Sequence, residues 1–202
     1  MTSSNHFSDN KTVQPSQIAT LILSFSDEFI SLMKEKTGNL PLVHFDEDWL
    51  SPCEQTRKDD CVYWQPVPIT SQKPLTFDNL EEALEISLHP DIKDYFTTIY
   101  SEAVEAICEE GALSLLFAWN EDDFYRLQEN IIGHILMKQK LKQAPTIFFA
   151  VTDEEDIIIS IMNETGEVWV ERVGCKPHKK MANSLSDFIK TLKPALAKDL
   201  TI

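Results

Sequence analysis

Three consecutive carboxylates, Glu121, Asp122 and Asp123, are the residues whose type and spacing come closest to acid–base chemistry. Two neighbouring carboxylates can serve as general acid and general base when burial and like charge separate their pKa values. These three, however, follow Asn120, and an asparagine side chain often accepts a hydrogen bond from a free N–H of a first helical turn. Because acids in a first turn are usually exposed to solvent, the pattern favours the start of a helix over a catalytic pair.

Other patterns of enzyme or metal chemistry are missing from the sequence. The five histidines form no HxxxH or HExxH motif, and the five glycines belong to no GxSxG, GxGxxG or phosphate-binding loop. The four acids at 153–156 lack the alternation and the glycine of an EF-hand loop and suit a solvated turn better. We therefore expect no catalytic residue, no cofactor and no metal, and we interpret His134 as a hydrogen-bonded core or cap histidine.

The four cysteines also lack the spacing of a metal or redox motif. None belongs to a CxxC pair, and reduced thiols in a cytosolic protein are the interpretation that fits best. Cys108 lies in an apolar segment and is expected to be buried, whereas a disulfide between Cys53 and Cys61 stays open as an alternative.

The carboxylates are carried by an amphipathic segment that predicts a helix from Glu121 to about Lys140. Its apolar residues recur at helical spacing and predict a face turned to the core: Phe124, Leu127, Ile131 and Ile135. Arg126 lies four residues after Asp122 and three before Glu129, so it can pair with either acid. Basic residues gather at the other end, where the helix dipole favours them: Lys138, Lys140 and Lys142.

The remaining segments predict an α+β fold with a largely antiparallel, five-stranded sheet and flanking helices. Further helices are expected at 16–36, 77–87, 91–99 and 183–192. The strands are expected at 103–108, 112–119, 146–152, 157–162 and 167–173. Segment 40–74 reads as irregular apart from a short edge strand at 61–66, and 174–180 reads as a basic loop. We expect one domain, residues 16–202, after a flexible tail at residues 1–15.

Charge is distributed very unevenly along the chain. The formal net charge is −15, with 33 acids against 18 bases and a pI near 4.6. Residues 76–130 alone carry fourteen acids and two bases, whereas residues 172–202 carry seven bases and two acids. So acidic a chain is repelled by nucleic acid and by anionic lipid, which argues against both as direct partners. Two interpretations of the acidic segment remain: a solvated face and a binding surface for a basic polypeptide. Because self-repulsion among clustered acids destabilises a fold, their clustering favours the binding surface.

The sequence gives no sign of a secretory signal or of a membrane-spanning segment. The chain begins with polar residues rather than a basic region followed by an apolar core, and no run of about 18 apolar residues occurs. We therefore expect a cytoplasmic protein that reaches a membrane only through a protein partner.

Two irregular motifs carry a resemblance to a known family. The sequence VYWQP at 62–66 and the pattern EDDFxRxQENxIGH at 121–134 resemble the Syd family of bacterial proteins, with support from PTIF at 145–148 and LKP at 192–194. The resemblance covers residues 16–196, and residues 1–15 are longer than the family pattern. The resemblance implies a SUKH-type α+β domain that acts as a binding protein and not as an enzyme.

The same resemblance implies a partner and a surface. Syd proteins bind SecY, the channel subunit of the SecYEG translocase, on the cytoplasmic side of the inner membrane and act as a check on its assembly. An acidic groove would then face Lys/Arg-rich cytoplasmic loops of SecY through Glu121, Asp122, Asp123 and Glu129, with Glu81 and Glu85 as further candidates. One alternative is a SUKH-type immunity protein that neutralises a basic toxin, and another is a hydrolase that uses the acidic cluster.

Overall fold

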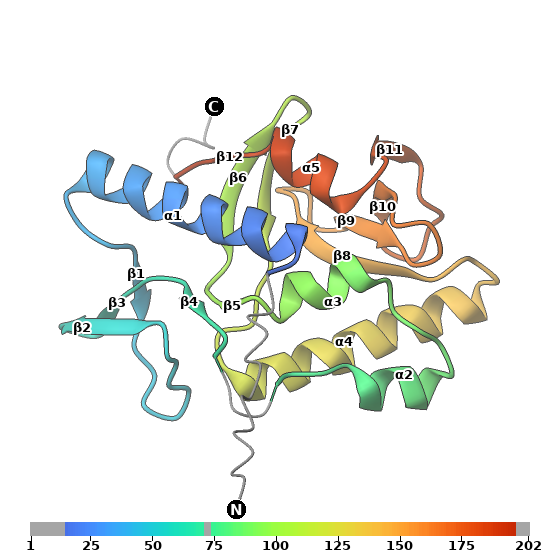
Figure 1. Ribbon diagram of the computed structural model, residues 1–202, viewed down its shortest axis with the longest axis horizontal. Helices are drawn as coiled ribbons and strands as arrows, with labels where there is room; N and C mark the ends of the chain where they lie inside the picture. The colour runs from blue at the N-terminus through green and yellow to red at the C-terminus, as the bar shows by residue number, and fades with distance from the viewer. Residues whose placement is uncertain (1–14, 71–73, 197–202) are drawn as a thin grey trace, which may run out of the picture.

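A seven-stranded antiparallel sheet organises the computed structural model, which describes residues 15–70 and 74–196 (Figure 1). Its strand order is β11-β10-β9-β8-β7-β6-β12. The strands are β6 (Val104–Cys108), β7 (Gly111–Leu115), β8 (Thr146–Val151), β9 (Ile157–Met162), β10 (Val168–Arg172), β11 (Lys179–Ala182) and β12 (Lys193–Pro194). The predicted α+β class with an antiparallel sheet is therefore confirmed.

The predicted number of five strands is wrong, because two short edge strands extend the sheet. The five expected strands correspond to β6 to β10, whose runs of apolar and β-branched residues mark them in the sequence. The added strand β11 forms within and just beyond the predicted basic loop at 174–180, and β12 has only two residues. Short polar edge strands of this kind show no alternation of apolar residues, so their pairing is visible only in the fold.

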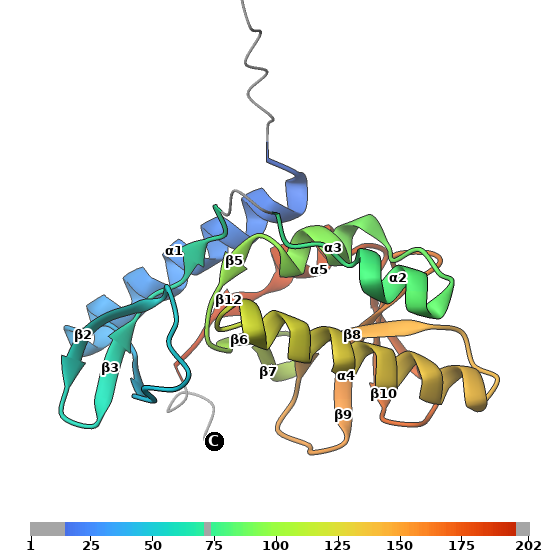
Figure 2. The same ribbon diagram turned by 90° about the horizontal axis from the view of Figure 1, so that it is seen from below.

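Helices cover both faces of the sheet. Adjacent aromatic residues of β8 show this: Phe148 contacts His134 with ring centroids 5.6 Å apart, whereas Phe149 contacts Tyr95 at 5.6 Å and Phe188 at 5.8 Å. One face therefore meets α4 (Glu121–Lys140), and the other meets α3 (Pro90–Phe96) and α5 (Leu185–Thr191). The long α1 (Gln17–Thr37) packs on α3 and α5, and α2 (Asp78–Leu84) lies beside α4 in both views (Figures 1 and 2).

A separate three-stranded sheet stands beside α1, at the lower left of Figure 1. It consists of β1 (Leu42–His44), β2 (Glu54–Lys58) and β3 (Cys61–Trp64) in the order β1-β3-β2. The strand predicted at 61–66 is present as β3, but it is the central strand and not an edge strand. Strands β4 (Val67–Pro68) and β5 (Ile99–Tyr100) form a third, two-stranded antiparallel sheet. The prediction that the rest of segment 40–74 is irregular is wrong for β1, β2 and β4.

The aromatic core joins this small sheet to the rest of the molecule. Trp64 is buried, stacks on Phe29 of α1 at 6.0 Å and meets Trp119 edge-on at 6.2 Å. Because Trp119 directly precedes the cap of α4, the packing that holds the small sheet also fixes where α4 begins.

The four cysteines are free, so the disulfide alternative between Cys53 and Cys61 does not apply. Cys53 is buried, whereas Cys108 is only half-buried, which corrects the expectation that it fills the core. It lies at the end of β6, where the chain turns into β7. Most of the predicted N-terminal tail, residues 1–14, lies outside the described residues.

Candidate partner-binding surface

The N-terminus of α4 is closed by reciprocal hydrogen bonds between its first residues. Asn120 adopts an extended backbone, and its Oδ1 accepts a hydrogen bond from the Asp123 N–H at 2.8 Å. In return, Asp123 Oδ2 accepts one from the Trp119 N–H at 2.9 Å. The predicted cap and both predicted helix ends are confirmed. The half-buried Asp123 carboxylate therefore has a structural task, which leaves it less available to a partner.

The other predicted acids of α4 are exposed along its outer face. Asp122 and Glu129 are seven residues apart and share the side of the helix that faces solvent. Glu121 lies on the side toward α2, where its Oε1 accepts a hydrogen bond from the Tyr125 hydroxyl at 3.1 Å. Asp122 and Glu129 therefore present like charges two helical turns apart on one side of α4, and Glu121 adds a third charge on the neighbouring side toward α2.

A loop that carries three further acids is fastened to the same end of α4. The Trp119 indole N–H donates to the Trp49 carbonyl at 3.1 Å, the Asn120 side-chain amide donates to the Leu50 carbonyl at 2.8 Å, and the Ser51 hydroxyl donates to the Trp119 carbonyl. Directly before Trp49, the loop exposes Asp46, Glu47 and Asp48. Sequence reasoning missed these three acids, although a run of acids before a tryptophan in a proline-rich segment was a visible signal.

Arg126 connects the loop to the helix in a way that the sequence did not predict. Its guanidinium lies 3.8 Å from the centroid of the Trp49 ring. Among the described residues it forms no ion pair with Asp122 or Glu129, so the expected pairing within the helix is wrong. Stacking on a large aromatic face replaces two weak surface ion pairs and leaves both carboxylates unneutralised.

The two predicted acids of α2 differ from one another. Glu85 is exposed at the C-terminal cap of α2 with φ 52°. The Glu81 carboxylate, only 19% exposed, accepts hydrogen bonds from the Leu88 N–H at 2.6 Å and from Lys93 at 3.0 Å. Partial burial opposes ionisation of Glu81, but these hydrogen bonds dominate and lower its pKa. Glu81 therefore fixes the turn between α2 and α3 and does not join the α4 acids.

A polar hollow of about 210 Å³ separates α2 from the first turns of α4. Asp78 of α2 and Glu121 of α4 both line this hollow, and Phe124 forms part of its wall. The other lining residues are Pro74, Leu75, Thr76, Asn79 and Tyr125. The size and the two negative charges suit the end of a lysine or arginine side chain.

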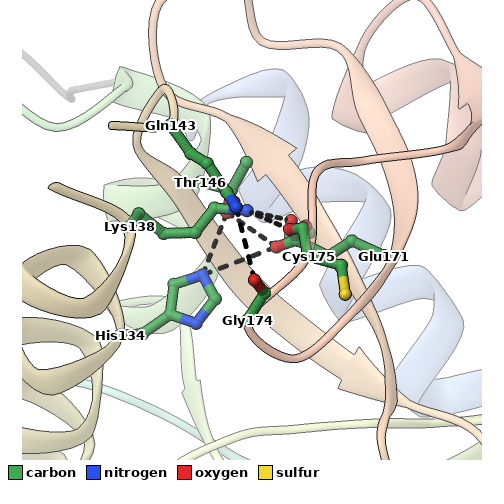
Figure 3. Close-up of polar contacts among 8 residues, drawn as sticks. His134, Lys138, Gln143, Thr146, Glu171, Gly174 and Cys175 are labelled. Atoms are coloured by element: carbon green, nitrogen blue, oxygen red, sulfur yellow. Dashed lines mark hydrogen bonds and ion pairs between the residues drawn. The ribbon is translucent and has the colours of Figure 1, made fainter. Parts of the chain in front are cut away.

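A buried polar cluster holds the second half of α4 against the sheet (Figure 3). Lys138 and Glu171 are both 0% exposed and form an ion pair at 2.5 Å. Glu171 also accepts hydrogen bonds from Thr146 at 2.6 Å and from Ser160 at 2.8 Å, and His134 Nε2 lies 2.9 Å from the Thr146 hydroxyl. We call these five residues the Lys138–Glu171 cluster.

The cluster accounts for two residues of α4 that the sequence analysis singled out, Lys138 and His134. Lys138 lies in the last turn of α4 as predicted, but its ammonium is buried there, enclosed by Glu171 and by the Cys175 carbonyl, the latter at 2.9 Å. His134 is the satisfied core histidine that was expected. Burial opposes ionisation of Glu171, but hydrogen bonds from His134, Lys138 and the two hydroxyls lower its pKa to about 2. With every partner internal, the cluster is a structural anchor for α4.

The described part of the chain contains neither a grouping of metal-binding side chains nor a membrane-spanning helix. Within residues 15–70 and 74–196, no three His, Cys, Asp or Glu side chains are grouped so that they could hold a metal ion. In those same ranges, no helix combines the length and apolar character that a bilayer crossing requires.

Comparison with known proteins identifies the family. The family model described as Syd protein (SUKH-2) matches residues 19–194. A protein named Syd from Colwellia psychrerythraea is 56% identical over 193 residues, which cover 92% of this chain and 94% of that protein. Proteins of the same name from Alteromonas mediterranea and Pseudoalteromonas atlantica are 47% and 40% identical; the matches cover 88% and 84% of this chain, and 98% and 92% of those proteins. The chain with this acidic, α4-centred surface therefore belongs to the Syd family.

Proposed function

We propose that this protein binds SecY in the SecYEG translocase and acts as a check on its assembly, without catalysing a reaction. The contact is made by Lys/Arg-rich cytoplasmic loops of SecY on an acidic surface. We define the acidic surface as six exposed carboxylates from the 46–48 loop and α4: Asp46, Glu47, Asp48, Glu121, Asp122 and Glu129. The observation that carries the proposal is that tertiary contacts bring these two acidic segments to one end of α4.

Electrostatics explains why such a surface suits a basic loop. Carboxylates gathered at one place add their potentials, which steers a positively charged segment toward them and raises the rate of association. Cytoplasmic loops of bacterial membrane proteins carry an excess of lysine and arginine. The net charge of −15 also repels anionic lipid, so the membrane contact in this proposal goes through the protein partner at the cytoplasmic side of the inner membrane.

Charge reversal tests the proposal with a matched control. The variant Asp122→Lys/Glu129→Lys changes the net charge by the same amount as Asp27→Lys/Glu35→Lys, which alters exposed residues of α1. Binding to SecYEG proteoliposomes at low salt should fall at least tenfold for the α4 variant and much less for the α1 variant. Equal losses would mean that only net charge matters. Unchanged binding of a folded α4 variant would move the contact elsewhere, and tight binding of a basic toxin in place of SecYEG would favour the immunity alternative.

A further inference from the structure

An apolar groove of about 340 Å³ lies between the second half of α4 and the sheet. Its walls come from α4, β8, β9 and the segments that follow β7 and β10, and it is open to solvent. The lining residues are Leu116, Gly133, His134, Met137, Phe148, Val151, Ile158 and Val173. The one polar side chain among them, His134, directs its Nε2 toward Thr146 in the Lys138–Glu171 cluster (Figure 3). The other lining side chains are apolar.

Gly133 keeps this groove open. It sits inside α4, where a glycine costs about 1 kcal/mol of helix stability relative to alanine. Its φ is not positive, and a Cβ built on it would meet no atom within 4 Å. Neither the backbone nor internal packing therefore requires glycine here. The missing side chain leaves space that nothing in the described part of the chain fills.

Negative charges stand on two sides of the groove. Glu129 is one helical turn before Gly133 on the same side of α4 and belongs to the acidic surface. At the end of the sheet, Val151 pairs with Ile158, and the hairpin that joins them carries the exposed acids Asp153, Glu154 and Glu155. Among the residues that the structure describes, Glu154 alone of these three lies near a base, Arg172, at 4.0 Å. An occupant of this groove thus needs an apolar part and positive flanks, and an anionic lipid tail or fatty acid is disfavoured.

We infer that the groove receives an apolar side chain of leucine, isoleucine or phenylalanine size from the same Lys/Arg-bearing segment that the acidic surface attracts. This inference rests on the proposed function and extends it from attraction to anchoring. The volume lies at the small end of ligand sites, about 300 to 1,000 Å³, which suits one or two side chains of a peptide. The acids then set the association rate and its salt dependence, and the apolar anchor sets a lifetime that salt changes little.

Substitutions at Gly133 separate the groove from the rest of the surface. Gly133→Leu places a side chain into the groove from an exposed helical position, whereas Gly133→Ala adds only the Cβ and favours the helix. Gln139→Leu serves as a control for an added leucine, because Gln139 is exposed on α4 and does not line the groove. All three variants change no charge, so the acidic surface stays as it is.

The deciding experiment measures two peptides of equal charge, Lys-Lys-Leu-Leu-Lys-Lys and Lys-Lys-Ser-Ser-Lys-Lys, by titration against the full chain and its variants. The leucine peptide should bind unmodified protein about tenfold more tightly than the serine peptide at every salt concentration. Gly133→Leu should abolish that difference and leave serine-peptide binding unchanged, while Gly133→Ala and Gln139→Leu keep it. Equal binding of the two peptides to unmodified protein would overturn the anchor alone. Binding of neither peptide at low salt would overturn the acidic surface with it.

Discussion

The Arg126 guanidinium lies 3.8 Å from the ring centroid of Trp49, and this contact ties the 46–48 acids to α4. The stacked arginine is a positive charge inside a negative surface, yet its position over the ring leaves Asp122 and Glu129 free of it. The loop is held by this contact and by backbone carbonyls that accept hydrogen bonds from Trp119 and Asn120. The arrangement preorganises both acidic segments before a partner arrives.

Removal of the Trp49 ring should therefore weaken partner binding without a change in charge. In Trp49→Ala the loop loses its aromatic contact, and we expect several-fold weaker binding to SecYEG proteoliposomes and faster amide exchange at 46–50. Trp49→Phe keeps an aromatic face for Arg126 and should retain most of the affinity. Identical affinity for Trp49→Ala and unmodified protein would show that the loop takes no part in binding.

Loss of the α4 cap should cost stability and loosen the same loop. Asn120→Ala removes the acceptor for the Asp123 N–H and the donor to the Leu50 carbonyl. We expect the free energy of unfolding in urea to fall by about 1 to 2 kcal/mol. Ser184→Ala, which removes the cap of α5, should cost a similar amount yet leave SecYEG binding unchanged. A cap variant of α4 with full stability would contradict the capping geometry.

The Lys138–Glu171 pair should be costly to break from one side. Glu171→Gln leaves the Lys138 ammonium buried without its counter-charge, so we expect a loss of about 3 to 5 kcal/mol of unfolding free energy at pH 7. Adding Lys138→Met to this variant removes the stranded charge, while the introduced glutamine still offers an oxygen to Thr146 and Ser160. The double variant should be more stable than Glu171→Gln alone, as measured by urea denaturation. The opposite order would refute an ionised pair.

The low pKa of Glu171 also predicts a pH dependence. The carboxylate has a pKa of about 2 in the folded protein against an ordinary value of 4.5, so the folded state binds fewer protons between these values. Its contribution to stability is complete above the unfolded pKa and is lost as the pH falls toward 2. The difference in unfolding free energy between unmodified protein and Glu171→Gln should be constant above about pH 5.5 and shrink below about pH 4.5. A difference in unfolding free energy that grows as the pH falls would contradict the lowered pKa of Glu171 in the folded protein.

Thiol reactivity should follow burial. Burial raises the pKa of the Cys53 thiol to about 11, whereas Cys175 is exposed. At pH 7 a maleimide should label Cys175 first and reach Cys53 only on unfolding, as mass spectrometry of digested protein would reveal. Rapid labelling of Cys53 in the native protein would contradict the complete burial of its side chain.

The sequence was enough to predict the helices and strands that depend on contacts between residues close together in the chain. Asn120 caps α4 through a residue three positions away, and the apolar stripe from Phe124 to Ile135 fixes the buried face, so both ends of α4 followed from the sequence. The strands β6 to β10 likewise carry their own apolar runs. Pairing partners that lie far apart in the chain left no such signal. The short strands β1 and β12 pair in this way with distant segments and escaped prediction. The strands β2 and β11 pair with their neighbours in the chain, but they are mostly polar and so carry no apolar run that would predict them.

The candidate surface also combines residues placed by helical spacing with residues placed by contacts between distant segments. The exposed acids Asp122 and Glu129 could be placed on one side of α4 by helical spacing alone. Lys138 has the sequence environment of an exposed helix end, and only its distant partner Glu171 reveals that it is buried. The 46–48 acids join α4 through contacts of Trp49 and Leu50 with Trp119, Asn120 and Arg126, which no local pattern announces.

In the function that we propose, clustered carboxylates on α4 and the 46–48 loop attract a basic segment of SecY. The most direct measurement is the association rate constant with SecYEG proteoliposomes as sodium chloride rises from low to physiological ionic strength and above. Exposed charges are screened over roughly 8 Å at physiological ionic strength, so the rate should fall steeply. The fall should be much shallower for Asp122→Lys/Glu129→Lys than for unmodified protein. A rate constant that does not depend on salt in the unmodified protein would contradict electrostatic attraction by these carboxylates.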